Sequence, residues 1–352
     1  MSDREPSDSS SLPRRDFLKL SGAAAAGLVA QDLLPGARRP TPPLPSNPVT
    51  PAAMPTRNLG KTGYRVGIFS LGGQAAVEKP HNDELAVSIV ERALDLGVNY
   101  IDTAAAYGGT ERWSQRYIGA VMARRRSETF LTSKTHDRTK DGSLRLLDES
   151  LRLLNTDHLD LWQLHNVMRM EEVERIFAPG GAIEALTKAR DEKMVRFLGI
   201  TGHFDPVPLM EGIRRFPFDT VLMSLNAADR HQASFAQDLL PLAVEKQMGV
   251  IGMKIPARSR ILASFTPPPE GLPVGQWEPN SGPGTLTMRE AMYYTLTHPV
   301  STVIIGCDSP AQVEEDVRLA QEFTPLSEAQ LTDLAVKTEP IKRQALFFRR
   351  WA

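Results

Sequence analysis

Residues 99–109 read Asn-Tyr-Ile-Asp-Thr-Ala-Ala-Ala-Tyr-Gly-Gly, and this stretch shows the pattern on which the fold depends. A short β-rich run, Asn99–Asp102, passes into a turn of small residues, and an amphipathic stretch over 111–125 follows. The same succession of strand, turn and helix recurs eight times between Thr56 and about residue 320. Such alternation predicts an α/β fold, and eight repeats favour a closed (β/α)8 TIM barrel over an open doubly wound sheet.

The remaining units follow the same pattern along the chain. Strands are expected at Val66–Leu71, Asn99–Asp102, Thr129–Ser133, Leu159–Leu164, Phe197–Ile200, Thr220–Leu225, Val250–Met253 and Thr302–Ile305. Helices are expected near 82–96, 111–125, 142–154, 181–193, 206–215, 233–247, 285–297 and 310–320, and a capping box at Ser327 begins a further helix. The Pro- and Gly-rich connection 255–284 follows the seventh strand, so it is expected on the carboxyl-terminal face, where barrel active sites lie.

Four side chains at the ends of these strands carry a coherent chemistry. Asp102 ends the second strand, Tyr107 lies in the following turn, Lys134 follows the third strand and His165 follows the fourth. A tyrosine has an ordinary pKa of about 10, and a nearby ammonium lowers it toward the range useful for proton transfer. We therefore predict Tyr107 as a general acid, with Lys134 tuning it and Asp102 holding the lysine. His165 is expected to donate a hydrogen bond that orients a carbonyl oxygen.

Each of these four residues alone also has a structural interpretation. Asp102 could be a hydrogen-bonded buried carboxylate, Tyr107 could pack in its Gly-rich loop, Lys134 could be solvated and His165 could be a core histidine. A closed barrel brings successive strand ends to one mouth, however, so their joint occurrence there favours a catalytic constellation.

Several sequence segments resemble the aldo-keto reductase superfamily. They are IDTAAAYGGTE (101–111), LTSKT (131–135) and LDLWQLHN (159–166), and the entry segment RNLGKTGYRVGIFSLGG (57–73) matches as well. The resemblance covers roughly residues 56–325. It implies reduction of aldehydes and ketones by hydride transfer from NADPH or NADH, with the tetrad Asp102, Tyr107, Lys134 and His165.

The resemblance also implies where a dinucleotide binds, without a Gly-rich Rossmann turn. Groups beside the nicotinamide are expected after strands five and six, the long connection is expected to clamp the pyrophosphate, and the adenosine end is expected at the start of the helix near 310. The implied residues are Thr201, Gly202, His203, Asn226, Met253, Lys254, Gly306, Ser309, Gln312 and Glu315. Ser309 and Gln312 could instead form only a helix capping box.

Two departures from the family pattern concern the cofactor. Leu222 stands where relatives often place a glutamine that bonds the nicotinamide amide, and leucine cannot form that bond. Gly306 and Gln312 stand where many NADPH-specific members carry a cation for the 2′-phosphate. NADP(H) is favoured by its frequency in the family, and NAD(H) is possible.

The N-terminal region resembles an export signal. Pro13-Arg14-Arg15-Asp16-Phe17-Leu18-Lys19 and the weakly apolar run Leu20–Ala30 are similar to a twin-arginine signal peptide, which is expected over 1–37. Eight prolines between Pro35 and Pro55 predict an extended linker over 38–56, with no helix or strand and no part in the folded domain. The barrel with a C-terminal extension then covers 57–352. These features predict a periplasmic protein that has the twin-arginine machinery as a partner.

Composition excludes several other classes of protein. The net charge is −1, so no field draws the chain to nucleic acid or to an anionic membrane. Cys307 is the sole cysteine and the seven histidines are scattered, so neither a disulfide nor a metal site is expected.

One alternative is an exported barrel that binds a cofactor or ligand without turnover, as a sensor or scaffold. The oligomeric state stays open, and the end 347–351 could cover the barrel mouth or mediate self-association.

Overall fold

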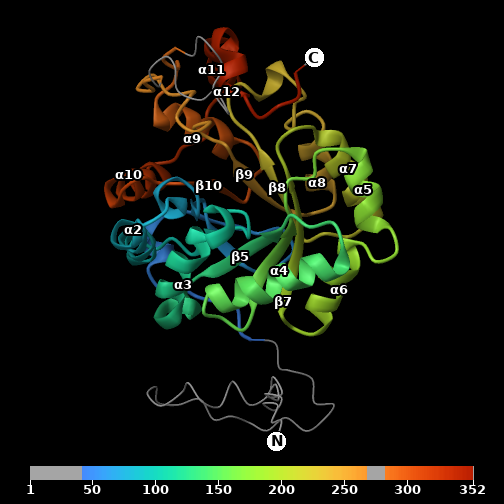
Figure 1. Cartoon of the computed structure of the whole chain (residues 1–352). Helices are drawn as coiled ribbons and strands as arrows, with labels where there is room; N and C mark the ends of the chain where they lie inside the picture. Colours follow the sequence, from blue (N-terminus) through green and yellow to red (C-terminus); the bar gives the residue numbers. More distant parts are fainter. Residues whose placement is uncertain (1–41, 268–281, 352) are drawn as a thin grey trace, which may run out of the picture. The chain divides into compact units, whose positions relative to one another are not determined.

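In this computed structural model, eight parallel strands close on themselves in the order β10-β3-β4-β5-β6-β7-β8-β9. Figure 1 shows the strands at the centre of the barrel with helices around them. The structure describes residues 42–267 and 282–351. The barrel strands are β3 (Phe69–Gly72), β4 (Tyr100–Asp102), β5 (Phe130–Thr135), β6 (Leu159–Leu164), β7 (Val195–Gly202), β8 (Thr220–Ser224), β9 (Gly249–Met253) and β10 (Thr302–Ile305). The predicted TIM barrel is therefore confirmed.

Helices connect the strands on the outside of the barrel. They are α2 (Asp83–Asp95), α3 (Trp113–Arg125), α4 (Lys140–Leu153), α5 (Met170–Phe177), α6 (Ala182–Asp191), α7 (Pro206–Arg215), α8 (Leu239–Glu245), α9 (Met288–Thr297) and α10 (Pro310–Gln321). After the last connection come α11 (Glu328–Thr338) and α12 (Lys342–Ala345), which lie beside α9 in orange and red in Figure 1. Among the described residues, no helix is long and apolar enough to cross a membrane.

The strands of the barrel are buried on both faces because both faces are covered. Every residue of β5 and β6 is buried. Side chains that point inward, among them Tyr100, Phe130 and Leu161, form one apolar cluster inside the barrel. Outward side chains pack against the helices in a larger second cluster. This arrangement leaves the ends of the strands as the place where side chains can meet a ligand.

The first predicted strand is divided in the structure. Val66–Leu71 was expected to be one strand, but β2 (Arg65–Gly67) pairs with β1 (Thr56–Asn58) in a hairpin, and β3 starts only at Phe69. Leu59, Tyr64 and Val66 belong to the cluster inside the barrel, so this hairpin closes the end at which the strands begin.

The Pro-rich segment before the barrel packs against it, which corrects the linker prediction for its second half. Residues Thr50–Ala53 form the short helix α1, and Asn47 and Thr50 are buried. The Asn47 amide donates to the carbonyl oxygen of Leu94 at 2.7 Å, and the Thr50 hydroxyl donates to that of Gly97 at 2.8 Å. Prolines favour the first turn of a helix, so their number did not exclude one here. The twin-arginine segment lies outside the described residues.

Two helices differ from the predictions for identifiable reasons. The expected helix 233–247 begins only at Leu239, because the buried carboxylate of Asp229 accepts hydrogen bonds from Ser234 Oγ and from the backbone N–H groups of Phe235 and Ala236. These bonds hold the preceding turn in a non-helical form. Helix α5, after β6, was not predicted. The central part of the long connection, 268–281, lies outside the described residues.

Candidate active site

Lys134 lies at the centre of a buried polar group at the carboxyl ends of β4 and β5. Its ammonium donates to Asp102 Oδ2 at 2.5 Å, to the carbonyl oxygen of Thr103 at 2.8 Å and to Tyr107 Oη at 3.4 Å. The Lys134 and Asp102 side chains are 0% and 1% exposed. Because both charges are buried, they are stable there only through these mutual bonds.

The second oxygen of the Asp102 carboxylate, Oδ1, also accepts hydrogen bonds. Thr132 Oγ1 donates to Asp102 Oδ1 at 2.9 Å, and the Gln163 amide approaches the same oxygen at 3.5 Å. Thr132 lies on β5, which pairs with β4, and Gln163 lies on β6, the next strand beyond β5. The carboxylate is therefore fixed in position, and it fixes the lysine beside Tyr107.

The fourth predicted residue lies next to the tyrosine. The rings of Tyr107 and His165 are 5.7 Å apart and nearly perpendicular, and His165 follows the end of β6. Tyr107, Lys134 and His165 share the wall of a cavity of about 340 Å³. The structure thus brings all four predicted residues together, three on the cavity and Asp102 directly behind Lys134.

Burial decides the protonation states in this group. Desolvation, followed by the charge of Asp102, holds the pKa of Tyr107 well above its usual value. This is opposite to the predicted lowering, because desolvation and the charge of Asp102 both disfavour the phenolate. Desolvation likewise holds the pKa of His165 well below its usual value, with Lys134 adding to the effect. The resting site therefore contains a protonated phenol and a neutral imidazole.

Some of the residues implied for the nicotinamide end line this cavity and others do not. Thr201, His203, Met253 and Lys254 lie on its wall, together with Leu222. Asn226 is 1% exposed and its amide donates to the carbonyl oxygens of Lys254 and Ala345, so it supports the chain beneath the site. Gly202 is buried, and a Cβ there would lie 2.8 Å from the carbonyl oxygen of Val167. Gly202 and Asn226 thus have structural positions.

Four further polar residues on the cavity wall were not predicted as site residues: Gln74, Glu78, Asn166 and Arg258. Gln74 and Glu78 follow β3 and Arg258 follows β9, so the barrel rule applied to every strand end would have found them. Asn166 directly follows His165 and has a left-handed backbone, with φ of 52°.

The same wall presents polar atoms suited to a carboxamide. Asn166 Oδ1 and His203 Nδ1 are buried and have no hydrogen-bond partner within the described part of the chain. Such atoms are costly unless a ligand or water meets them. An acceptor and a ring nitrogen beside Tyr107 fit the amide of a nicotinamide, so the residues present are compatible with that cofactor even though Leu222 contributes no hydrogen bond.

A second cavity, of about 450 Å³, adjoins the start of α10. Gly306, Gln312 and Glu315 line it, as the resemblance implied, and Pro256 and Ser259 form another part of its wall. Ser309 is the helix N-cap, and its hydroxyl accepts from the Gln312 N–H at 3.3 Å. The capping interpretation of Ser309 therefore holds, whereas Gln312 serves both the helix and the cavity.

The segment between the two cavities has an unusual backbone. Lys254, Ala257, Arg258 and Ser259 all have positive φ, between 49° and 67°. Such conformations cost free energy in residues with a Cβ and concentrate at functional sites. Lys254 and Arg258 face the first cavity, while Ser259 faces the second. One strained turn therefore joins the two cavities.

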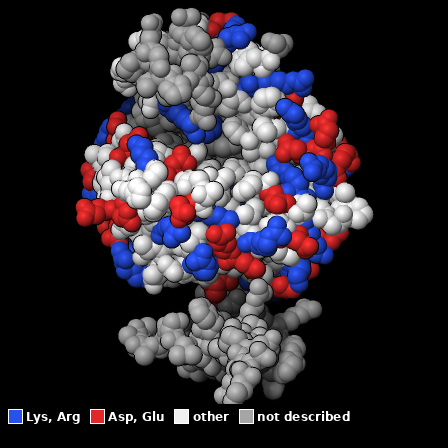
Figure 2. Space-filling view, viewed as in Figure 1, with Lys and Arg blue, Asp and Glu red and all other residues white. Residues whose placement is uncertain are grey.

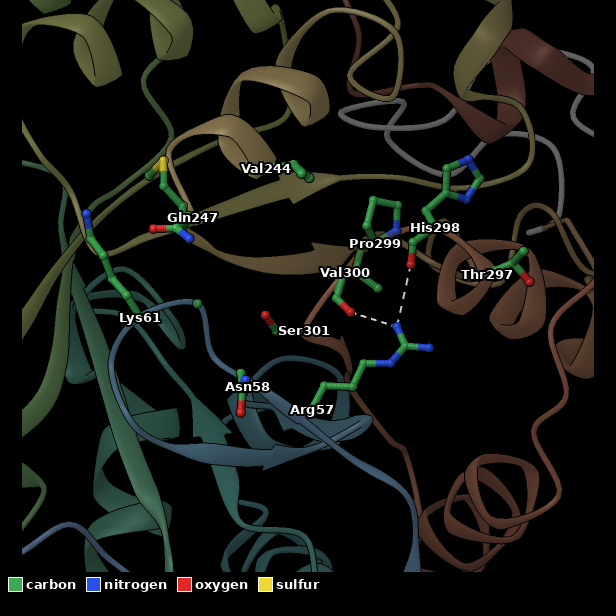
Figure 3. A pocket seen from close by; sticks show the side chains of 12 residues that line it. Arg57, Asn58, Lys61, Val244, Gln247, Thr297, His298, Pro299, Val300 and Ser301 are labelled. Atoms are coloured by element: carbon green, nitrogen blue, oxygen red, sulfur yellow. Dashed lines mark hydrogen bonds between the residues drawn. The ribbon is translucent and has the colours of Figure 1, made fainter.

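A third cavity, of about 650 Å³, lies at the opposite end of the barrel (Figure 3). Its wall includes Arg57, whose guanidinium donates to the carbonyl oxygens of Leu296 and Val300 at 2.8 and 2.7 Å. These bonds satisfy the carbonyls of Leu296, in the last turn of α9, and of Val300, just after the helix. Arg57 is thus engaged in holding the hairpin β1–β2 to the barrel, and this hollow has no group comparable to the tetrad among the described residues that line it.

Two proteins with similar sequences are named as a dehydrogenase and an oxidoreductase. The chain is 29% identical over 318 residues to L-galactose dehydrogenase of Arabidopsis thaliana, in an alignment that covers 81% of this chain and 95% of that protein. It is 24% identical to the uncharacterized oxidoreductase YqkF of Bacillus subtilis, over 76% of this chain and 91% of that one.

Solved structures agree with this likeness. The holo form of aldo-keto reductase AKR11C1 from Bacillus halodurans aligns with a TM-score of 0.64 and 25% identity, over 81% of this chain and 96% of that one. The Aldo/keto reductase family profile matches residues 65–269, which is more than half of the chain. This protein therefore belongs to the aldo/keto reductase family and is an oxidoreductase.

Proposed function

We propose that this barrel reduces aldehydes and ketones with NADPH or NADH, and that Tyr107 supplies the proton. The observation that carries the proposal is the contact of Lys134 with both Asp102 and Tyr107 at the wall of one cavity. A bound reduced nicotinamide supplies the hydride, which leaves negative charge on the carbonyl oxygen. The Tyr107 phenol, whose raised pKa keeps it protonated, gives its proton to that oxygen.

Lys134 and His165 stabilise the charges that this transfer creates. The ammonium faces the phenolate oxygen that remains on Tyr107, at 3.4 Å in the resting site. The imidazole of His165, neutral because its pKa is lowered, keeps an N–H that can donate to the carbonyl oxygen without adding a positive charge. Together they favour transfer to a carbonyl placed between Tyr107 and His165.

The cavity wall supports a small polar substrate. Gln74, Glu78, Asn166, His203 and Arg258 offer hydrogen-bonding groups around the tetrad. Relatives named L-galactose dehydrogenase, 6-dehydroglucose reductase and D-threo-aldose 1-dehydrogenase are similar to this chain. We therefore propose hydroxylated aldehydes and ketones, or the corresponding sugars in the reverse reaction, as the substrate class.

Turnover of purified protein tests the proposal. The protein is mixed with each reduced dinucleotide and a panel of hydroxylated and aromatic carbonyls, and the loss of reduced-cofactor absorbance is followed. Oxidation of sugars with each oxidised dinucleotide is followed in parallel. Turnover that is abolished in Tyr107→Phe supports the proposal. Dinucleotide binding without turnover across the whole panel would favour a sensor or scaffold instead.

We also propose that the chain is exported through the twin-arginine pathway, on the basis of Arg14-Arg15 and the weakly apolar run after it. Because that route carries folded proteins, a dinucleotide could be bound before export. Residues 1–41 are fused to a reporter that is active only outside the cytoplasm. Replacing Arg14 and Arg15 by lysine should abolish reporter activity, whereas the same replacement at Arg38 and Arg39 should not. Equal export of both variants would contradict the proposal.

A further inference from the structure

We propose that Glu78 is the residue by which this site selects carbonyls with neighbouring hydroxyl groups over carbonyls of the same chain length without them. The inference rests on the proposed function, because it concerns the substrate of the same cavity. Hydride and proton transfer involve only the carbonyl group, so the tetrad acts alike on both kinds of substrate. Selection between them therefore depends on other groups of the cavity wall.

The wall offers one charged acceptor for substrate hydroxyl groups. Among the described residues that line the cavity, Glu78 alone carries a carboxylate. A carboxylate accepts hydrogen bonds at two oxygens and donates none, so it can bind two adjacent hydroxyls at once. The charged side chains of Lys254 and Arg258 on the same wall are donors, which suit acceptors on a ligand instead.

The carboxylate of Glu78 is oriented without being neutralised. Gln74 Nε2 donates to both of its oxygens at 3.3 Å, and the side chain is half-buried. An amide partner of this kind leaves the negative charge in place. The charge also acts on the catalytic group: desolvation and Asp102 raise the pKa of Tyr107, and Glu78 adds to this effect. Glu78 therefore lies near the position at which a carbonyl meets Tyr107.

The backbone that carries Glu78 is fixed by packing. Glu78 ends the short 3-10 helix η2 (Ala75–Glu78), which follows β3, and Ala76 and Val77 of this helix are buried. Asn82 Nδ2 donates to the carbonyl oxygen of Ala76 at 2.8 Å. Because the turn is held in this way, a substrate meets a carboxylate whose position is already set, and less conformational entropy is lost on binding.

The experiment compares kcat/KM for glyceraldehyde, which carries adjacent hydroxyls, with kcat/KM for propanal, which has the same carbon chain and no hydroxyl. Both are measured for the full chain with the reduced dinucleotide that it uses. Glu78→Leu removes the acceptor, so we expect the glyceraldehyde-to-propanal ratio to fall by at least about tenfold. Glu78→Gln keeps one neutral acceptor oxygen, so its ratio should fall less. The glutamine variant also carries the test if the leucine variant does not fold.

Glu84→Leu is the matched control. It makes the same change at the next glutamate along the chain, which is exposed on α2 and lies off the cavity. Its ratio should stay within about twofold of that of the unaltered protein. The ratio separates selection from damage to the site, because a distorted site or an altered pKa of Tyr107 affects both aldehydes and cancels.

The outcomes separate this inference from the proposed function. A ratio that falls in the Glu78 variants and not in Glu84→Leu supports both. Turnover with an unchanged ratio in the Glu78 variants, or with an equal fall in Glu84→Leu, would overturn the inference alone. Absence of turnover of any carbonyl by the unaltered protein would overturn the proposed function and the inference with it.

Discussion

At the scale of single residues, the placement of Lys134 determines what Tyr107 can do. The ammonium is buried and its pKa is lowered by desolvation, with Asp102 opposing that effect. A buried ion pair with one partner removed leaves an uncompensated charge, which costs several kcal/mol. Asp102 and Lys134 are thus mutually dependent, and Tyr107 is the member of the group that can pass a proton into the cavity.

Replacing the tyrosine tests its role as proton donor. Tyr107→Phe removes the hydroxyl and keeps the ring against His165, so we expect kcat to fall by about 10²–10⁴-fold while dinucleotide affinity changes little. Steady-state kinetics and calorimetry of the same preparation measure the two quantities. Tyr117→Phe, which makes the same change on α3 and outside the cavity, is the control. A Tyr107→Phe enzyme with wild-type kcat would assign the proton transfer elsewhere.

Asp316 provides a prediction about pH and stability. Its folded-state pKa is about 7, whereas an unfolded aspartate titrates at about 4. The stability contributed by the protonated form is complete below about pH 4 and is lost as pH rises through about 7. Asp316→Asn keeps the shape without the charge, so we expect it to be more stable than the wild type above pH 7 by on the order of 1–3 kcal/mol, with the advantage shrinking toward pH 4.

Urea unfolding at several pH values measures this difference. Glu314→Gln, which removes the same charge at an exposed position on the same helix, is the control. A constant difference between Asp316→Asn and the wild type at all pH values would contradict the assigned titration.

At the scale of elements, the C-terminal segment 346–351 is held to the barrel by a buried charge. Arg349 forms an ion pair with Asp229 in which both side chains are 0% exposed, and its guanidinium lies 3.9 Å from the centre of the Phe235 ring. The backbone carbonyl oxygens of His203 and Ser224 accept from the same guanidinium. The segment thus packs next to His203, which lines the cavity beside Tyr107, as expected of a segment that covers the barrel mouth.

Breaking this pair should destabilise the protein strongly. Arg349→Met leaves Asp229 buried without its partner, so we expect a loss of about 3–5 kcal/mol in the free energy of unfolding. The double variant Arg349→Met/Asp229→Leu should lose less than the sum of the two single changes. Denaturant unfolding measures all four proteins of this cycle.

The neighbouring arginine supplies a control for the C-terminal cycle. Arg350 is 71% exposed and only approaches Asp205 at 3.9 Å, so Arg350→Met should change stability by less than about 1 kcal/mol. Strict additivity of the Arg349 and Asp229 changes would show that the two residues do not interact.

At the scale of the whole molecule, charge is distributed without a dominant field. Figure 2 shows Lys and Arg interspersed with Asp and Glu over the described surface of the face in view, in agreement with a net charge of −1. Charges of one sign gather only locally, as in the cavity beside α10, which is lined by Asp308, Glu315 and Asp316. We therefore expect ligand choice to depend on the lining of individual cavities rather than on long-range attraction.

The segment before the barrel, residues 42–55, contributes to the stability of the whole fold. A chain that begins at Pro42 keeps the hydrogen bonds of Ser46, Asn47 and Thr50 to the ends of neighbouring connections, while a chain that begins at Thr56 loses them. We expect the shorter chain to be less stable by about 2–4 kcal/mol, from these hydrogen bonds and the exposure of the surface beneath them. Thermal unfolding of the two chains, each compared with the full-length protein, measures the effect. Equal midpoints of thermal unfolding for the two chains would show that residues 42–55 are only a linker.

The sequence by itself determined the barrel and the tetrad. Alternation of apolar runs and amphipathic stretches fixes the order of strands and helices, and parallel closure then forces the ends of β4, β5 and β6 together. Asp102, Lys134 and His165 follow from their positions at those ends. The capping residues Ser309 and Ser327 were likewise predictable, because a helix cap depends only on local backbone geometry.

Only the tertiary structure decided the environments of these residues. The raised pKa of Tyr107 depends on burial and on the charge already paired with Lys134, neither of which is a local property of the sequence. The structural place of Asn226, the packing of Asn47 against the barrel and the acidic wall around Glu315 depend on contacts between segments distant in the chain. The physical reason is the same in each case: periodicity specifies which residues face inward, while solvent exclusion and charge pairing arise only after closure of the barrel.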